Sequence, residues 1–382
     1  MWPERPNVAN AYPTHSTMIP TEIRSGLQRL GVTSITPMPP GLSGARVFRC
    51  SGEETLVLRC WPDGTTEQRV NEIHAVVSAV ASTFDLLPKY KPIDPQGATL
   101  TIDASGHIWE LATWMPGQPL DEDAPLGSIG KGAAAIAQMH HAMGRLGRWQ
   151  QPAPAIAQRL QRVAWLNQHL PGCLATDLQG RVHPSVAAPV VRACRLLKQQ
   201  WPTTAPRLVA ALTPLASRRL PLQYVIRDIH REHMLYSAGK VVGIIDFDAL
   251  RVDTVAVDLA RWATSFLQFR DSPVQTIDRI LADYRCEASL SSQSAPRQLD
   301  APLAADRTFG IPEIGIGQSV LPELDAPEFR TLVLTIAETS LWISLANWVV
   351  WLVGESRQFA NLQLVSRRLG RLIESVDGQT ER

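Results

Sequence analysis

Acidic and imidazole side chains gather in two short clusters in the second half of the chain. The first cluster holds Asp228, His230 and His233, and the second holds Asp246 and Asp248. Carboxylates and imidazoles that converge on one point can hold a divalent cation and supply a general base. The residue types therefore indicate a site for metal-assisted chemistry, provided that the fold brings the two clusters together.

A short β-hairpin is expected to do so. The apolar runs 234–236 and 241–245 predict two strands, and the Ser-Ala-Gly-Lys segment 237–240 predicts the turn between them. The first cluster precedes the first strand and the second follows the second strand, so both lie at the same end of the hairpin. On these residues alone, a solvated hairpin with charged ends is the alternative interpretation.

Composition narrows the classes of protein. The chain has 382 residues, which suits two lobes rather than one ordinary core. Its formal net charge is +1, and no block of Lys and Arg stands out, so nothing indicates a nucleic-acid or anionic-membrane partner. The five cysteines are scattered without a C-x-x-C pair, which argues against a disulfide framework and favours a cytoplasmic location.

Two segments could in principle act as membrane or export signals, the first residues and the most apolar late run. The first residues, MWPERPNVANAYPTHS, contain no apolar signal core, and we expect a loose lead-in over the first 20 residues. The apolar run 341–353 is shorter than the roughly 20 residues that span a bilayer. We therefore predict a buried core helix there and no membrane partner.

Apolar periodicity predicts a small sheet before residue 116 and mostly helices after it. The expected elements of the first part are a helix at 21–30, strands at 46–50 and 55–60, a helix at 67–82, and strands at 99–104 and 107–114. After residue 117 we expect helices at 129–143, 156–169, 186–200, 327–353 and 358–376, and loops at 171–184, 202–206 and 287–325.

The hairpin segment resembles the active-site region of the aminoglycoside phosphotransferase and choline kinase group. That family has a loop of form H-G-D-x-H-x-x-N, a short hairpin and then I-D-[FW]-[EDG]. Here residues 226–233 read IRDIHREH and residues 245–248 read IDFD. A further family element, D-P-x-x-D-[LV]-A, is half present over 254–260.

The resemblance covers about residues 35–265 and implies an α+β, two-lobed, protein kinase-like fold. Its small N-lobe would be an antiparallel sheet, and its C-lobe mainly helical. The expected division is an N-terminal extension with a helix (1–34), an N-lobe that binds the nucleotide (35–116) and a C-lobe with the catalytic and metal-binding motifs (117–382).

Roles follow from the resemblance, residue by residue. Asp228 matches the catalytic aspartate, which would orient an acceptor hydroxyl and accept its proton, with His230 beside it in the loop. Asp246 matches the aspartate that binds magnesium, and Asp248 is a second candidate ligand two residues on. Such sites work mainly by positioning and charge neutralisation. Asp258 matches a structural acid that supports the loop.

Two positions of the loop depart from the family pattern. The first His is Ile226, and the metal-binding Asn is His233. Imidazole is a poorer ligand for a hard cation than an amide or carboxylate oxygen. Three outcomes are open: His233 still binds the metal, a softer metal such as Mn²⁺ is used, or Asp246 and Asp248 hold Mg²⁺ without it. Lost catalysis is a fourth.

The N-terminal half supplies candidate nucleotide contacts. The turn at Ser43 and Gly44 resembles the family's phosphate-covering G-x-[ST]-[NG]. Arg59 ends a V-L-[KR] strand and would pair with the phosphates. Glu72 lies in the next helix, where the resemblance implies an ion pair with that basic residue. A plain turn, an exposed strand residue and a solvated helix face are the respective alternatives.

The run 109–117, WELATWMPG, resembles the segment that forms the hinge between the two lobes in that family. Backbone groups around Thr113 and Met115 would hydrogen-bond adenine. Further on, His140 ends a run similar to the family's L-A-x-L-H, and we expect a structural role for it.

The sequence therefore predicts an ATP-dependent phosphotransferase that uses Mg²⁺, with Mn²⁺ as the alternative. The acceptor would be a hydroxyl of a small molecule, such as an aminoglycoside, amino alcohol, sugar or homoserine-like compound. A polycationic acceptor needs an acidic surface, which the loop 121–123 (Asp-Glu-Asp) offers. Two rival hypotheses are a nucleotide-binding pseudokinase and a metal-dependent hydrolase that uses Asp228, His230 and His233.

Overall fold

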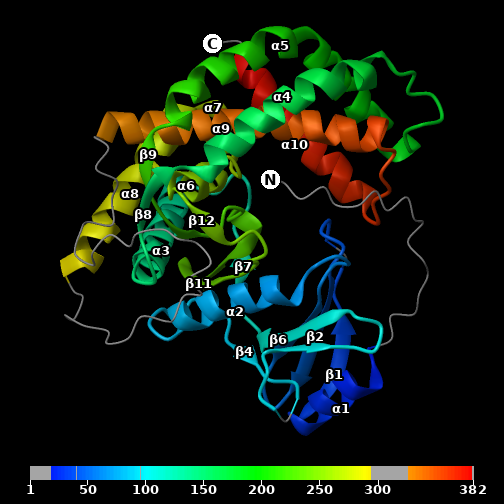
Figure 1. Cartoon of the computed structure of the whole chain (residues 1–382), viewed down its shortest axis with the longest axis vertical. Coiled ribbons are helices and arrows are strands. Elements are labelled where there is room, and N and C mark those ends of the chain that lie inside the picture. The colour runs from blue at the N-terminus through cyan, green and yellow to red at the C-terminus, as the bar shows by residue number, and fades with distance from the viewer. Residues whose placement is uncertain (1–18, 40, 95, 294–325, 381–382) are drawn as a thin grey trace.

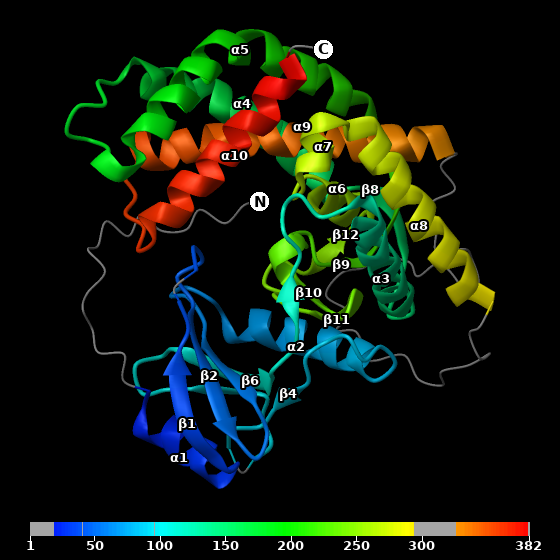
Figure 2. The ribbon, with the colours of Figure 1, turned by 180° about the vertical axis from the view of Figure 1, so that it is seen from behind.

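The computed structural model describes residues 19–39, 41–94, 96–293 and 326–380. They form two lobes (Figure 1): a small lobe with an antiparallel sheet and a larger lobe with most of the helices. The view from behind shows the same division (Figure 2). This arrangement confirms the predicted α+β, two-lobed fold. Most of the expected lead-in and most of the expected loop 287–325 lie outside the described residues.

The small lobe is built on a six-stranded antiparallel sheet. Its strands are β1 (Val32–Pro37), β2 (Arg46–Gly52), β3 (Leu56–Cys60), β4 (Tyr90–Lys91), β5 (Leu100–Ile102) and β6 (Ile108–Thr113). The order is β1-β2-β3-β6-β4, and β5 also pairs with β6. The predicted hairpin of 46–50 and 55–60 is confirmed as β2 and β3, whereas β1 and β4 were not predicted.

The alternation of side chains along these strands gives the sheet two different faces. Helix α1 (Thr21–Arg29) packs on one face, against apolar residues such as Leu58. The described part of the segment before residue 35 therefore belongs to the small lobe. Helix α2 (Glu67–Ala81), which begins after the capping Thr66, covers the other face. Because neighbours along a strand point to opposite faces, Arg59 lies on the α2 side, toward the large lobe.

Two small sheets of the large lobe carry the predicted catalytic segment. One joins β7 (Gln118–Pro119), β10 (Met234–Ser237) and β11 (Lys240–Ile244), and the other joins β8 (Trp149–Pro152), β9 (Arg219–Val225) and β12 (Arg251–Asp253). The hairpin prediction is confirmed, because Met234 pairs with Ile244. Just beyond this pair, the Ile245 amide donates to the carbonyl of His233 at 2.9 Å. The hairpin thus brings both clusters to one end.

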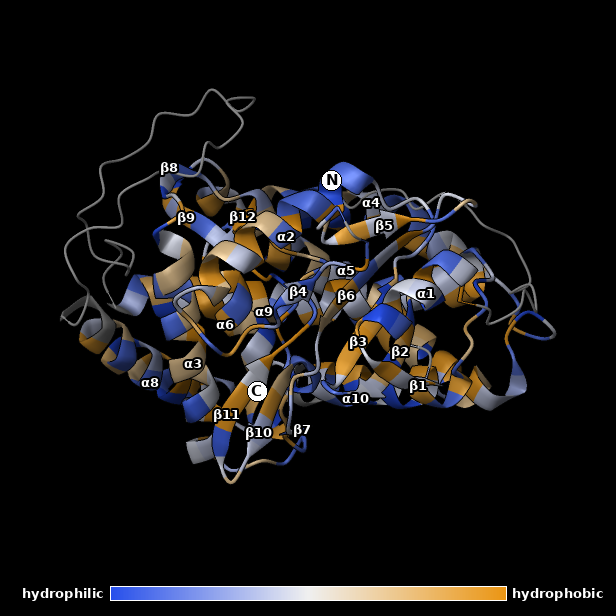
Figure 3. Cartoon of the chain, turned by 90° about the horizontal axis from the view of Figure 1, so that it is seen from below, coloured by the Kyte–Doolittle hydropathy of each residue, from blue (hydrophilic) through white to orange (hydrophobic). Residues whose placement is uncertain are grey.

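Helices make up the rest of the large lobe. They are α3 (Leu126–Gly144), α4 (Pro154–Ala175), α5 (Pro184–Ala216), α6 (Ala256–Ala263), α7 (Leu267–Asp271), α8 (Pro273–Gln293), α9 (Ala326–Val349), a π-helical turn (Val350–Gly354) and α10 (Leu362–Thr380), with a 3₁₀ turn at Arg231–His233. Apolar and polar segments alternate along α8 (Figure 3), as expected of a helix that packs on one side.

Two loop predictions were wrong, one of them only in its first residues. Residues 202–206 lie inside α5, which has four prolines in its interior, and residues 287–293 of the expected loop 287–325 belong to α8. Proline disfavours a helix interior because it lacks a hydrogen-bond donor and clashes with the preceding turn. Helix α5 nevertheless buries a continuous apolar stripe that includes Trp201 and Leu208. Tertiary burial therefore outweighs the local preference.

The apolar run 341–353 lies in α9 and the π-helical turn. The helix Pro327–Gly354 is long and apolar enough to span a membrane, but 72% of its most apolar window is buried within the protein. Trp342, Leu345 and Val349 are among its buried residues. The prediction of a core helix is confirmed.

Candidate active site

A buried carboxylate fixes the loop that carries Asp228. Asp258 on α6 is fully buried, and its two oxygens accept the backbone amides of Ile226 and Arg227 at 2.9 and 2.5 Å. His140, also fully buried, places Nε2 2.9 Å from the same carboxylate. These contacts confirm the predicted supporting role of Asp258 and the structural role of His140.

The Asp228 carboxylate is half exposed and is held on one side only. Nε of Arg261, on α6, donates to its Oδ1 at 2.6 Å. Its other oxygen has no hydrogen-bond partner among the described residues. A carboxylate oriented through one oxygen and free at the other can receive a proton from an approaching hydroxyl.

His233 links Asp228 to Asp246. Its Nδ1 lies 3.0 Å from the backbone oxygen of Asp228, and its Nε2 lies 3.3 Å from Oδ2 of Asp246. A carbonyl can only accept, so Nδ1 must carry a proton and donate. In the neutral ring, Nε2 then points a lone pair toward the Asp246 carboxylate. Two such acceptors face each other favourably only around a proton or a cation.

Asp246 has an unusual backbone conformation and a perturbed carboxyl pKa. Its φ is 66°, in the left-handed region that side chains with a Cβ enter at a cost of about 1–2 kcal/mol. Burial, and next the neighbouring carboxylate of Asp248, raises the pKa of Asp246. A bound cation would oppose both effects. Strain of this kind collects at functional sites, so the geometry supports Asp246 as a metal ligand.

Asp248 is bound to Arg59 rather than directed at Asp246. Both guanidinium ends of Arg59 donate to the two carboxylate oxygens of Asp248, one of them at 2.6 Å. Burial alone would lower the pKa of Arg59, but the Asp248 carboxylate raises it. The structure therefore makes Asp248 the partner of the predicted phosphate-binding arginine, and its role as a metal ligand stays a prediction.

The expected ion pair between Arg59 and Glu72 is wrong. Glu72 is exposed and pairs with Arg69 at 3.5 Å. The second carboxylate near Arg59 belongs to Glu110 on β6, at 3.8 Å. Arg59 and Glu110 are directly paired across β3 and β6, so the contact arises between strands rather than from the helix.

Glu110 is a central residue that the sequence analysis missed. It is 6% exposed, and its Oε2 lies 2.8 Å from Nε1 of Trp61 and 2.7 Å from Nε2 of His74 on α2. The Trp61 ring also lies under the Arg59 guanidinium, 4.2 Å from ring centroid to Cζ. The signal available in the sequence was a single Glu within an otherwise mostly apolar predicted strand.

The predicted nucleotide contacts lie in the small lobe and at the end of β6 that leads to the large lobe. The turn with Ser43 and Gly44 joins β1 to β2, and Gly44 has a φ of 83° that suits glycine. At the hinge, the Thr113 amide already donates to the carbonyl of Lys89 at 3.0 Å. Met115 packs against Gly243 of β11. Contacts of Ser43, Gly44, Thr113 and Met115 with a nucleotide stay predictions.

Arg227 is a third departure from the family loop, in addition to Ile226 and His233. It stands where the pattern H-G-D has glycine, and its φ of 69° is a conformation that glycine adopts freely. Its side chain reaches Oε1 of Gln158 on α4 and lies 3.4 Å from Oδ2 of the buried Asp253. The strained backbone thus carries a guanidinium into the large lobe beside Asp228.

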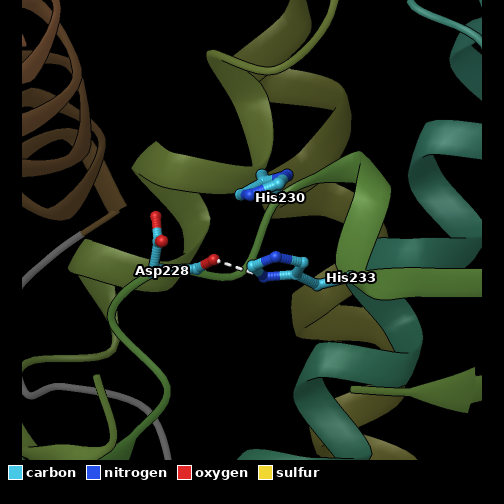
Figure 4. Close-up of side chains that lie close together, drawn as sticks. All are labelled: Asp228, His230 and His233. Carbon is cyan, nitrogen blue, oxygen red and sulfur yellow. Dashed lines mark hydrogen bonds between the residues drawn. The ribbon is translucent and has the colours of Figure 1, made fainter. Parts of the chain in front are cut away.

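The two imidazoles of the loop lie in contact at a tilt of 37°, and both form hydrogen bonds. The His230 and His233 rings lie 3.7 Å apart, and Figure 4 shows the bond from His233 to the Asp228 backbone oxygen. The Glu232 amide donates to Nδ1 of His230 at 3.3 Å. Burial, and next Arg261, lowers the pKa of His230 well below its usual range, so the ring is neutral at pH 7.

These bonds count against the hydrolase hypothesis. Asp228, His230 and His233 each offer one ligand atom within 4.8 Å of the others. Metal binding through Nε2 of His230 would need the proton on Nδ1, which instead accepts the Glu232 amide, so His230 would have to change its tautomer and lose that bond. The arrangement instead favours Asp228 as a general base beside two metal ligands, His233 and Asp246.

The fold and this arrangement define a phosphotransferase of the kinase-like class. The sequence matches the phosphotransferase enzyme family (APH) over residues 34–290, more than half of the chain, and the protein belongs to that family. The predicted resemblance is therefore confirmed. No protein with a curated description matches the chain at a significant level.

Solved structures share the fold at low sequence identity. An aminoglycoside phosphotransferase from Alicyclobacillus acidocaldarius is 11% identical, with a TM-score of 0.55 over 97% of this chain and 96% of its own. A spectinomycin phosphotransferase bound to ADP and spectinomycin is 10% identical, with a TM-score of 0.56 over 93% and 98%. An amicoumacin kinase bound to AMP-PNP, Ca²⁺ and its antibiotic is 11% identical, with a TM-score of 0.51 over 92% of each chain.

Proposed function

We propose that this protein transfers the γ-phosphoryl group of ATP to a hydroxyl group of a small molecule. The observation that carries the proposal is the continuous contact Asp228–His233–Asp246. It links the family's catalytic aspartate to its metal-binding aspartate at one end of the β10–β11 hairpin. Membership of the phosphotransferase family supports the reaction class.

The residues present fit a divalent cation. Nε2 of His233 and Oδ2 of Asp246 are 3.3 Å apart, and two adjacent ligands at about 2.1 Å from a six-coordinate metal lie about 3.0 Å from each other. The bond of His233 Nδ1 to the Asp228 carbonyl is the kind of contact that orients a metal-binding imidazole. We propose Mn²⁺ or Mg²⁺, with Mn²⁺ preferred, because imidazole suits transition metals better than Mg²⁺. A cation there would neutralise charge on the phosphates.

In the proposed reaction the acceptor oxygen forms a bond to the γ-phosphorus as the bond from that phosphorus to the β–γ bridging oxygen breaks. The hydroxyl proton passes to the free carboxylate oxygen of Asp228, whose other oxygen is held by Arg261. ADP leaves with the bridging oxygen. Arg59 and the turn at Ser43 and Gly44 would bind the phosphates, and the half-exposed Asp228 would meet the acceptor.

The direct test is calorimetric titration of AMP-PNP into the purified protein with Mn²⁺, with Mg²⁺ and with EDTA. We expect binding that requires the metal and weakens at least about tenfold, or 1.4 kcal/mol, in Asp246→Asn. Binding unchanged by EDTA or by Asp246→Asn would remove Asp246 from a metal site. Absence of nucleotide binding under all three conditions would refute the proposal.

A nucleotide-binding pseudokinase is the second candidate, because His233 replaces the metal-binding Asn and Asp248 is engaged by Arg59. ADP release with and without candidate acceptors separates the two functions. Turnover that Asp228→Asn abolishes supports the enzyme, whereas nucleotide binding without any turnover supports the pseudokinase. We also propose a cytoplasmic location, with which the five free cysteines are consistent.

A further inference from the structure

Several arginine side chains lie on the catalytic loop or in contact with it. Arg261 uses only its Nε on the Asp228 carboxylate. Its two terminal nitrogens have no hydrogen-bond partner within the described parts of the chain, and its side chain is 35% exposed. These nitrogens are directed donors with a fixed planar geometry, which suits two oxygens of one carboxylate or phosphate.

A second group of guanidiniums lies beside the same loop. Arg227 and Arg159 share a single buried carboxylate, that of Asp253. Arg159 itself hydrogen-bonds only neutral groups, the Ser340 hydroxyl and the Ala155 carbonyl. One carboxylate thus opposes two guanidiniums, which leaves a local surplus of positive charge between α4 and the catalytic loop.

The third group shows the same imbalance. Arg231 and Arg368 both pair with Glu232, at 3.3 and 2.9 Å. One residue of the acidic loop 121–123, which the sequence offered as a surface for a polycation, is also paired. Its Glu122 forms an ion pair with Arg371 on α10. Two of the acidic side chains near the catalytic loop, Glu232 and Glu122, are therefore already paired with arginines.

We infer that the acceptor is an anionic alcohol, a small hydroxyl compound with a carboxylate or phosphate group that Arg261 binds and Arg227 attracts. This inference rests on the proposed function and specifies its substrate class. A hydroxyl that gives its proton to Asp228 lies about 2.8 Å from the free carboxylate oxygen. It therefore lies next to the guanidinium that holds the other oxygen at 2.6 Å. A polycation in that place would meet like charge.

The test uses calorimetry on the full chain loaded with AMP-PNP and Mn²⁺. The probes are glycerate and glycerol 3-phosphate, which distinguish a carboxylate from a phosphate, together with neutral glycerol and the cations choline and kanamycin. We expect one or both anions to bind at least about tenfold more tightly than glycerol and both cations. Equal or tighter binding of glycerol, choline or kanamycin would overturn the inference.

A matched pair of variants assigns the binding to Arg261. In Arg261→Gln we expect the affinity for the anion to fall at least about tenfold, with AMP-PNP affinity changed less than about threefold and partial recovery in Arg261→Lys. The control is Arg330→Gln, because Arg330 pairs through Nε with Asp278 at similar exposure, 37% and 50% against 35% and 51% for the Arg261 pair. Anion binding unchanged in Arg261→Gln would overturn the assignment.

Failure of the acceptor class and failure of the function give different results. If AMP-PNP binds with metal but neither anion binds up to about 10 mM, above the range of specific affinities, the anionic acceptor is wrong and the nucleotide site stands. If AMP-PNP itself does not bind, the proposed function fails, and the inference fails with it.

Discussion

The two sides of the catalytic loop differ in how many carboxylates lie near their arginines. On the side of the predicted nucleotide site, the partly buried Arg59 meets two carboxylates, those of Asp248 and Glu110. On the other side, Arg227 and Arg159 share only Asp253. A side on which carboxylates balance the arginine charge can accept a ligand that brings its own counter-cation, as ATP does. An unbalanced side attracts a ligand that brings negative charge itself.

The largest expected effect comes from removing the group that both sides share. Asp228→Asn keeps the shape of the side chain but cannot accept the hydroxyl proton, so we expect kcat to fall by about 10²–10⁴-fold. The measurement is ADP release with the best acceptor, with circular dichroism to confirm that the variant is folded. Turnover within about tenfold of the wild type would show that Asp228 is not the base.

The next effect tests whether the nucleotide side is built around Glu110. Glu110→Ala would leave Nε1 of Trp61 and Nε2 of His74 without their buried partner and remove one of the two carboxylates near Arg59, so we expect the free energy of unfolding to fall by about 2–4 kcal/mol. Denaturant titration measures it. The exposed Glu22→Ala serves as the control, expected within about 0.5 kcal/mol of the wild type. A similar small change for Glu110→Ala would contradict the central role of Glu110.

A smaller effect concerns the choice of metal. His233→Asn restores the ligand that the family pattern has, and an amide oxygen suits Mg²⁺ better than an imidazole nitrogen does. We expect the preference for Mn²⁺ over Mg²⁺, measured as the ratio of AMP-PNP dissociation constants, to fall by about tenfold. The same ratio in both proteins would mean that His233 does not touch the metal.

The smallest expected effect tests the corrected ion pair. Glu72 is exposed and contacts Arg69 on its own helix, so Glu72→Gln should change the free energy of unfolding by less than about 0.5 kcal/mol. ADP release should be unchanged as well. A clear loss of activity would mean that Glu72 swings to Arg59 during the reaction, as the resemblance to the family implied.

The sequence was most informative where chemistry depends on short-range order. The hairpin between His233 and Ile245 followed from two apolar runs and a turn, and the roles of Asp258 and His140 followed from motif positions. Contacts that depend on strand register were not predictable in this way. Glu110 reaches Arg59 because β3 pairs with β6 in one register, and no pattern within either strand encodes that register.

Backbone conformation was the second source of error. The replacement of glycine by Arg227 was visible in the loop, but its meaning became clear only with a φ of 69° and a buried partner. In α5 the prolines at 202 and 206 predicted a loop, because local preference was the only information available. Burial of the apolar stripe decided otherwise, and stripes of that length are hard to recognise when proline interrupts them.

Arg69 gives the molecule a mechanical constraint. From α2 of the small lobe, its NH2 group donates to the carbonyls of Asp248 and Leu250 in the large lobe. Any separation of the lobes must therefore break both bonds or carry α2 with the large lobe, while the sheet moves over it. If α2 stays with the large lobe, the small lobe does not move as one body, and movement of the sheet alone must still break the pair between Arg59 on β3 and Asp248.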